Sequence, residues 1–414
     1  MADTSSQPVR RGRRPRPPLH AADIKHFKFF KPIRKLLARL RQHKDGPNRK
    51  LHFDDLLALV LLFFFNPVLT SLRSLVRASH LRRVQQKLGL GPTSLGSLSE
   101  SASSFSPDLL RSVVQELAGC VQAQDAPARP TGLDKELAVV AVDGTLLEAL
   151  PRMAWALWQD EEHRGVKLVL EFNVLDSIPQ AACVSHANTN EREALRANLA
   201  PGKLYLVDAG FAEYGLFEAI RQAQSSFVGR LRDNAVWDVM QDRPVSQVDR
   251  RAGVVLDQVV RLGCASKRED LSSPVRVVKV HVQNPPSPGL ARRRSRVSSK
   301  KTFRHRPEAY DLILVTDRMG LPAEVIALLF RYRLTIELFF RWLKCILRLR
   351  HLLFESPNGV KTLVYAALIA SLLVVLWTRR KPTKGTLEMI QLYFQGWAEL
   401  DELEAHIAGL EKIS

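Results

Sequence analysis

The chain has 414 residues, and its 61 Lys and Arg against 42 Asp and Glu give a formal net charge of +19. An apolar fraction of 46% argues against a largely disordered chain, and four scattered cysteines without a Cys-x-x-Cys pair argue against a zinc ribbon or a disulfide scaffold. The basic excess favours nucleic acid as partner, with a ribosome-binding or membrane-surface protein as the alternatives.

The N-terminal region is predicted to be basic and then helical. Residues 1–20 are rich in Pro and Arg and lack the apolar core of a secretory signal. We expect a disordered arm that follows phosphates, or a solvated tail with no partner. Residues 21–125 are predicted to form a helical DNA-binding domain, or a plain helical support. Within it we expect the Ser-rich stretch 94–106 to be a loop that precedes a helix at Ser106-Pro107.

Two apolar runs require a decision between core and membrane. These runs, residues 56–69 and 363–377, are each shorter than the roughly 20 residues of a spanning helix. We therefore predict buried core helices and no membrane partner.

The hydrophobic pattern of the sequence changes after a linker-like stretch at residues 122–136. Residues 137–233 alternate between period-2 and period-3.6 patterns, which predicts the order β-β-β-α-β-α-β. We assign residues 126–233 to the first part of an α/β core, 318–380 to its second part, and 381–414 to a C-terminal helical segment.

Residues 234–317 interrupt this core. They contain three strand-like runs and a loop with eight Lys or Arg between Arg292 and Arg306. We predict a β-rich insertion whose basic loop contacts phosphates or only improves solubility.

Two carboxylates stand at the ends of apolar strand patterns. Asp143 follows "AVVAV" and Asp208 follows "KLYLV", and a glycine lies close behind each. A lone Asp here is also compatible with a turn or an N-cap. Two acids on adjacent strand ends repel each other unless a cation joins them, and hard oxygen ligands suit Mg²⁺ or Mn²⁺. With a third acid they would form a two-metal site.

Glu337 is the candidate third acid. On a helix it shares one face with Arg333, Arg341 and Lys344, at spacings of four, four and seven residues. An ordinary ladder of i,i+4 ion pairs is the alternative, worth about 0.2–0.5 kcal/mol per pair. The apolar residues around this acid favour a metal ligand beside cations that bind DNA phosphates.

The spacing R-x3-E-x6-K, with an aromatic three residues before the Arg, falls on Phe330, Arg333, Glu337 and Lys344. This pattern, together with "VAVDGT" and "YLVDAGF", resembles the Y-R-E-K signature of bacterial insertion-sequence transposases of the DDE group, the insertion-sequence-four type. The chain departs from the signature at Phe330, where Tyr is usual. The resemblance covers about residues 138–380.

The resemblance implies an α/β fold: an RNase H-like core with a mixed five-stranded sheet, interrupted by the insertion and preceded by the helical domain. It implies Asp143, Asp208 and Glu337 as catalytic ligands of two Mg²⁺ or Mn²⁺ ions. The implied activity is cleavage of double-stranded DNA at inverted-repeat ends and strand transfer into target DNA, by a homodimer in a synaptic complex. A DNA-binding relic and a related nuclease that never joins strands are the alternatives.

Further residues are expected to contact DNA. These candidates are Arg333, Lys344, Arg341, Arg230, Arg232 and Phe330. Arg230 and Arg232 are equally compatible with a solvent-facing strand pair. The sequence contains no P-loop and no G-x-G-x-x-G, so we expect no nucleotide cofactor. The expected location is the bacterial cytoplasm, on the nucleoid when DNA is bound.

Overall fold

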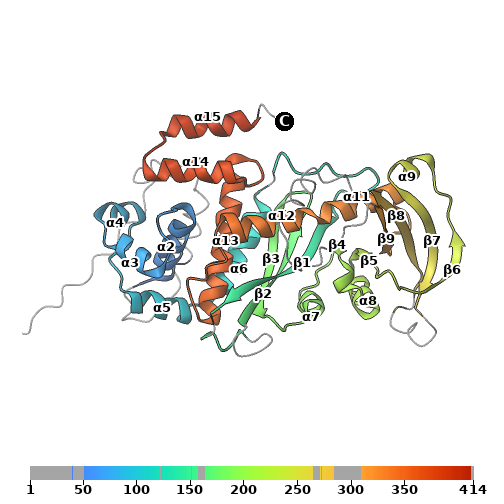
Figure 1. The fold of residues 1–414 in the computed structure, drawn as a ribbon, viewed down its shortest axis with the longest axis horizontal. Coiled ribbons are helices and arrows are strands. Elements are labelled where there is room, and N and C mark those ends of the chain that lie inside the picture. The colour runs from blue at the N-terminus through green and yellow to red at the C-terminus, as the bar shows by residue number, and fades with distance from the viewer. Residues whose placement is uncertain are drawn as a thin grey trace, which may run out of the picture.

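A single mixed sheet runs through the described part of the chain (Figure 1). The computed structural model describes residues 51–121, 123–150, 152–156, 164–263, 273–283 and 309–411, with Leu40 and Leu271. The N-terminal arm predicted at 1–20 and the basic run between 292 and 306 lie outside the described residues. The fold is α/β, as predicted.

The sheet contains nine strands in the order β3-β2-β1-β4-β5-β9-β8-β7-β6. The strands are β1 (Ala138–Ala149), β2 (Arg164–Asn173), β3 (Ile178–His186), β4 (Lys203–Val207), β5 (Ser226–Arg230), β6 (Trp237–Asp242), β7 (Val254–Leu262), β8 (Val275–Gln283) and β9 (Ala309–Thr316). Strands β1, β4 and β5 pair in parallel, and all other neighbours are antiparallel.

The sheet has more strands than the five that the sequence predicts for the core. Strand β9 pairs antiparallel with β5, at Gly229 and Val315 among others, so β6–β9 continue the sheet. The free backbone N–H and C=O groups of a β5 edge would need partners, and β9 supplies them. The strand β6 and the helix α9 (Gln247–Arg251) were not predicted.

Side-chain alternation gives the sheet two different faces. Along β1, Val139 and Ala141 belong to one apolar cluster, whereas Val140 and Val142 belong to the other. The first face is covered by α11 (Ala323–Arg333), α12 (Thr335–Arg341) and α13 (Pro357–Thr378). The second face is covered by α7 (Glu191–Arg196) and α8 (Tyr214–Gln222), on the opposite side of the sheet in Figure 1.

The N-terminal region is helical, as predicted. Its described helices are α2 (Phe53–Phe65), α3 (Leu72–Ser79), α4 (Arg82–Leu88), α5 (Leu95–Ser104) and α6 (Asp108–Gly119). The expected Ser-rich loop is instead helix α5. Ser94 accepts a hydrogen bond from the Ser97 amide, and Leu98 and Ala102, four residues apart, are buried.

Helix α13 is the central core helix. It is long and apolar enough to cross a membrane, but 89% of its most apolar window is buried inside the protein. It packs against α2, α5, α6 and β3. The prediction that both apolar runs are core helices is confirmed. Two further helices, α14 (Lys384–Gln395) and α15 (Leu400–Glu411), follow it and are separated at Gly396, whose φ is +81°.

The insertion strands anchor the start of α11. Arg276, 1% exposed, pairs with Asp257 through Nε–Oδ1 (2.7 Å) and Nη2–Oδ2 (2.6 Å). Its Nη1 also donates to the carbonyls of Met319 (3.3 Å) and Leu321. Breaking one partner of such a buried pair typically costs about 3–5 kcal/mol. Strands β7 and β8 therefore fix the segment that leads directly into α11.

Arg348 joins the end of the α11–α12 segment to the N-terminal helices. Its guanidinium donates to the carbonyls of Phe63 (2.5 Å), Asn66 (3.1 Å), Pro67 (3.2 Å) and Leu69 (3.3 Å). The last carbonyls of a helix have no intrahelical partner, and Arg348 supplies a donor to that of Phe63 in the last turn of α2 and to three carbonyls that follow the helix.

Replacing Arg348 by Asn removes these hydrogen bonds, while Asn tolerates the left-handed backbone of this position (φ +60°). We expect the free energy of unfolding to fall by about 2–3 kcal/mol, measured by urea unfolding, because carbonyls at a buried helix end lose their donor. Arg350→Asn, at an exposed position two residues later, should change it by less than about 0.5 kcal/mol. Equal effects of the two variants would contradict this role.

Candidate active site

Asp143 and Asp208 are neighbours because β1 and β4 are parallel and in register. Val142 pairs with Val207, and an aspartate follows each of these valines directly. By alternation both aspartates lie on the face covered by α11 and α12. Asp208 follows the last residue of β4, caps the short turn Ala209–Phe211 and accepts a hydrogen bond from the Ala209 amide (2.8 Å).

The sequence pattern predicts that Asp143 ends its strand, but in the structure the strand continues beyond it. Strand β1 continues to Ala149 because β2 still pairs with it, up to Arg164. Only the pairing with β4 stops, at Val142. Asp143 therefore lies at the point where the sheet loses one neighbour and opens toward solvent.

The segment that carries Glu337 is broken into pieces, whereas the sequence pattern predicts one continuous helix. Helix α11 ends at Arg333, and α12 begins at Thr335. A π-helical turn follows at Trp342–Ile346, a distortion that is often found at functional sites. Phe339 of α12 packs on Phe172 of β2, with ring centroids 4.9 Å apart, and this contact places α12 on the sheet.

The three carboxylates converge on the guanidinium group of Arg333. Its Nη1 lies 3.5 Å from Asp143 Oδ2, and its Nη2 lies 3.4 Å from Asp208 Oδ2 and 3.0 Å from Glu337 Oε1. The tertiary structure thus brings together all three acids that the sequence singled out. Arg333 and Glu337 do form the i,i+4 ion pair that the sequence offered as the alternative to a metal ligand. The same guanidinium also contacts both aspartates.

Burial differs sharply within this group. Arg333 is 5% exposed, while the side chains of Asp143, Asp208 and Glu337 are 24%, 37% and 54% exposed. The Nε and Nη1 atoms of Arg333 are buried and have no hydrogen-bond partner. Among the described residues, no three His, Cys, Asp or Glu side chains lie where they could hold one metal ion. Asp143, Asp208 and Glu337 instead surround the guanidinium group of Arg333.

Burial raises the pKa of the Asp143 carboxyl to about 6. The positive charge of Arg333 and the hydrogen bond from the Gly144 amide (2.9 Å) act in the opposite direction. The negative charges of Glu191 and Glu337 add to the upward shift. Burial therefore favours the neutral form of the Asp143 carboxyl as the pH falls through about 6.

Lys344 and Arg341 lie differently from one another. Lys344 reaches back to β1, where its Nζ donates to Thr145 Oγ1 (2.7 Å) and to the Leu146 carbonyl (3.1 Å). Desolvation lowers the pKa of its ammonium group. Arg341 is exposed. Arg341 ends α12 and Lys344 lies within the π-helical turn, so the single helical face that the spacing predicts does not hold for Lys344.

Of the remaining candidates for DNA contact, Arg230 lies beside the acids, Arg232 is near it in sequence, and Phe330 is buried next to Arg333. Arg230, at the end of β5, lies 4.0 Å from Asp208 (Nη1 to Oδ1), and Arg232 is exposed nearby in sequence. Phe330 is 6% exposed and its ring centroid lies 5.7 Å from the Arg333 guanidinium carbon. A contact between Phe330 and DNA would therefore have to act through Arg333.

Glu191 is a further acid close to Asp143, on the opposite face of the sheet, which the sequence analysis missed. It is the first residue of α7 and pairs with Lys167 of β2 (3.1 Å). A Cβ on Gly144 would come within 2.4 Å of the Glu191 carboxyl group, so the missing side chain makes room for this acid. A glycine directly after Asp143 was the available signal.

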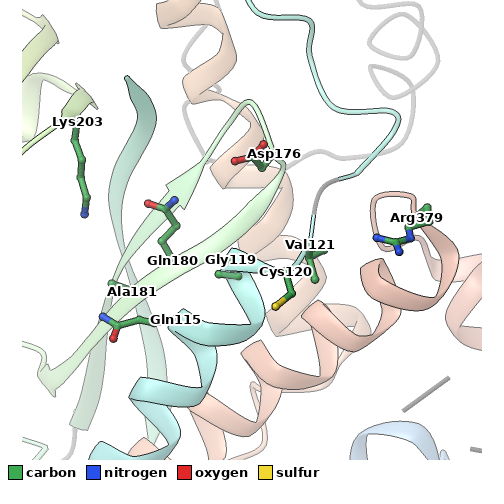
Figure 2. A pocket seen from close by; sticks show the side chains of 10 residues that line it. Gln115, Gly119, Cys120, Val121, Asp176, Gln180, Ala181, Lys203 and Arg379 are labelled. Atoms are coloured by element: carbon green, nitrogen blue, oxygen red, sulfur yellow. The ribbon is translucent and has the colours of Figure 1, made fainter. Parts of the chain in front are cut away.

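A cavity of about 690 Å³ lies elsewhere in the described part of the chain (Figure 2). It opens between Gln115 of α6, Gln180 of β3 and Arg379 at the end of α13, and Lys203 at the start of β4 also lines it. Asp208 follows the other end of β4. The cavity is thus separated from the carboxylates by the length of that strand.

The Asp143→Asn variant tests the raised pKa. A folded-state pKa of about 6, against 3.8 ordinarily, means that the folded protein holds this proton more tightly than the unfolded chain. The resulting stabilisation is complete below about pH 4 and is lost as the pH rises through 6. Relative to wild type, Asp143→Asn should gain up to about 3 kcal/mol between pH 4 and 7. The measurement is urea unfolding in the presence of a chelator. A difference that does not change with pH would show that Asp143 titrates normally.

Comparison with known proteins places this chain among transposases. Residues 134–373, more than half of the chain, match the family described as "Transposase DDE domain". The "Putative transposase y4zB" of Sinorhizobium fredii (strain NBRC 101917 / NGR234) is 27% identical over 218 residues, which cover 52% of this chain and 54% of that protein. The chain thus spans about half the length of this curated relative.

A solved structure also resembles the chain coarsely. It is the cryo-EM structure of the piggyBac transposase synaptic complex with hairpin DNA, at a TM-score of 0.40 and 10% sequence identity. The likeness covers 90% of this chain and 80% of that one.

Proposed function

Because this chain belongs to the transposase DDE domain family, we propose that it cuts DNA at the ends of a mobile element and joins them to target DNA. The family membership confirms the resemblance found in the sequence. The observation that supports the proposed chemistry best is the convergence of Asp143, Asp208 and Glu337 on one point. These three acids come from β1, from the end of β4 and from α12.

The strand order supports an RNase H-like core within the larger sheet. Strands β3, β2 and β1 pair antiparallel with one another, whereas β4 pairs in parallel with β1 and β5 in parallel with β4. Helices cover both faces, and two acids lie at the carboxyl ends of the β1–β4 pairing. Open α/β sheets place their sites at such ends.

The donor set fits hard divalent cations. All three groups are carboxylates, which Mg²⁺ and Mn²⁺ prefer, and their side chains are partly open to solvent. The buried guanidinium between them indicates that this point favours positive charge. Asp143, Asp208 and Glu337 would hold the ions. When bound, two such ions would activate the attacking oxygen and stabilise the leaving oxygen.

Several cations lie close to these acids, one in space and the others in sequence. Arg230 is next to Asp208, and Arg341 and Arg232 are exposed. We assign to them the binding of backbone phosphates, which positions the scissile bond against the carboxylates. Lys344 holds the continuation of β1 through Thr145 and so fixes the direction of the strand that carries Asp143.

The partners follow from the same chemistry. The substrates would be double-stranded DNA, as the inverted-repeat ends and as target, and two copies would synapse two ends. Helices α3 and α4 supply a second basic surface with exposed Arg73, Arg77, Arg82 and Arg83. No Asp or Glu occurs between residues 56 and 99, so nothing in that stretch of sequence neutralises it. The protein would act in the bacterial cytoplasm, on the nucleoid.

The triad variants test the activity. Asp143→Asn, Asp208→Asn and Glu337→Gln should each reduce cleavage by at least about a thousandfold, because each removes a charged ligand at the reacting phosphate. DNA binding should persist. The assay uses a labelled duplex carrying one inverted-repeat end, identified in the DNA that flanks the gene, with Mg²⁺.

The matched control is Asp233→Asn, an exposed acid close to Arg230, which should cleave as wild type does. Cleavage by a triad variant at the wild-type rate would refute the assignment. Binding without cleavage by wild type would indicate a DNA-binding relic, and nicking without joined product a nuclease.

The basic surface on α3 and α4 is tested by salt dependence. Replacing Arg77 and Arg82 by Gln should weaken binding to any duplex and lower the slope of log K against log salt by about 2, one for each lost phosphate contact. Arg251→Gln, at an exposed position on α9, is the control and should leave the slope unchanged. An unchanged slope for the double variant would remove these helices from the interface.

A further inference from the structure

We propose that Arg333 and divalent metal ions compete for the same carboxylate oxygens, and that Arg333 turns to a DNA phosphate when metal binds. The inference rests on the proposed function, because it takes Asp143, Asp208 and Glu337 as the metal ligands. It adds a device that links metal binding to DNA binding through one side chain.

The competition follows from the contacts. The oxygens that face Arg333 are Asp143 Oδ2, Asp208 Oδ2 and Glu337 Oε1, one from each acid, within 3.0–3.5 Å of its Nη atoms. Carboxylate oxygens bind Mg²⁺ at about 2.0–2.1 Å. A metal ion at that distance from these oxygens would occupy the space that the guanidinium group fills. The guanidinium is also positively charged, so the two repel at close range.

The guanidinium is held weakly enough to leave. Only the Nη2–Glu337 contact, at 3.0 Å, is close to an ideal hydrogen-bond length, and the contacts to both aspartates are longer. Nε and Nη1 are buried without a hydrogen-bond partner, which leaves part of the desolvation cost uncompensated. A divalent ion carries twice the charge and binds the oxygens at shorter distance.

The local backbone and surroundings permit the movement. Arg333 is the last residue of α11, next to the break at Leu334, so the backbone that carries its side chain is not part of one continuous helix. Phe330 packs against the guanidinium and offers an aromatic surface past which it can slide. Arg230 lies on the far side of Asp208, and a phosphate drawn there would meet Arg333 as well.

The first test measures Mn²⁺ affinity of the full chain without DNA, by the electron paramagnetic resonance signal of free Mn²⁺. Arg333→Gln should bind Mn²⁺ about tenfold more tightly than wild type, because three ion-pair contacts no longer oppose the metal. Arg251→Gln removes the same charge from an exposed position on α9, outside the residues assigned to metal or DNA binding at this site, and should bind as wild type does. Thermal unfolding of each variant checks that it is folded, and Arg333→Lys, which cannot span three acids, should show an intermediate gain.

The second test separates competition from simple repulsion. A duplex carrying one inverted-repeat end should raise the Mn²⁺ affinity of wild type several-fold more than that of Arg333→Gln, because only wild type has a guanidinium that the phosphate can draw away. Simple charge repulsion predicts the same increase for both proteins. Strand cleavage by Arg333→Gln should fall although its metal affinity rises.

The outcomes distinguish this inference from the proposed function. If Arg333→Gln binds Mn²⁺ as wild type does or more weakly, while Asp143→Asn loses binding, the metal site stands and the competition is overturned. If Asp143→Asn binds Mn²⁺ as wild type does, the metal assignment fails and this inference fails with it.

Discussion

The ion-pair cluster around Arg333 is the interaction on which the rest of the site depends. One guanidinium joins β1, the end of β4 and the start of α12, whose acids are 65 and 129 residues apart in sequence (208 − 143 and 337 − 208). Three carboxylates at this spacing would repel one another without a cation between them. A positive charge at this point is therefore a requirement of the fold as well as of the chemistry, and Arg333 or a metal ion can meet it.

The sheet makes this convergence possible. Parallel pairing of β1 with β4 places Asp143 beside Asp208, and alternation turns both toward α11 and α12. The opposite face receives Glu191, which fits against Gly144 because that residue has no side chain. Acidic groups thus approach the Asp143–Gly144 step from both sides of the sheet, and together with burial they keep the Asp143 pKa high.

The strands of the insertion do more than extend the sheet. Through Arg276 and Asp257 they hold the backbone at Met319 and Leu321, immediately before α11, and so determine where Arg333 lies at the other end of that helix. At the far end of the segment, Arg348 fixes the chain to the end of α2. The helices that carry the site are thus held at both ends by arginines, the buried Arg276 of β8 and the half-buried Arg348 against the N-terminal helices.

The sequence by itself determined the class of fold, the strands β1–β5 with their two intervening helices, and the three acids. These features are local. The hydrophobic period of a strand or helix can be recognised in consecutive residues, and so can a carboxylate that follows an apolar strand. The spacing around Glu337 also carried the family resemblance. The Ser-rich helix α5 was missed because serine competes with helix formation locally, and only the packing of Leu98 and Ala102 decides in favour of the helix.

Only the tertiary structure decided which groups meet. The sequence places Arg333 four residues from Glu337 but contains nothing that brings it to Asp143 and Asp208, and Glu191 carries no motif at all. The union of β5 with β9, the π-helical turn that directs Lys344 to Thr145, and the burial of Phe330 likewise depend on contacts between distant segments. Such contacts are fixed when backbone groups at a strand edge and side chains in the core satisfy one another, and a one-dimensional pattern does not record those pairings.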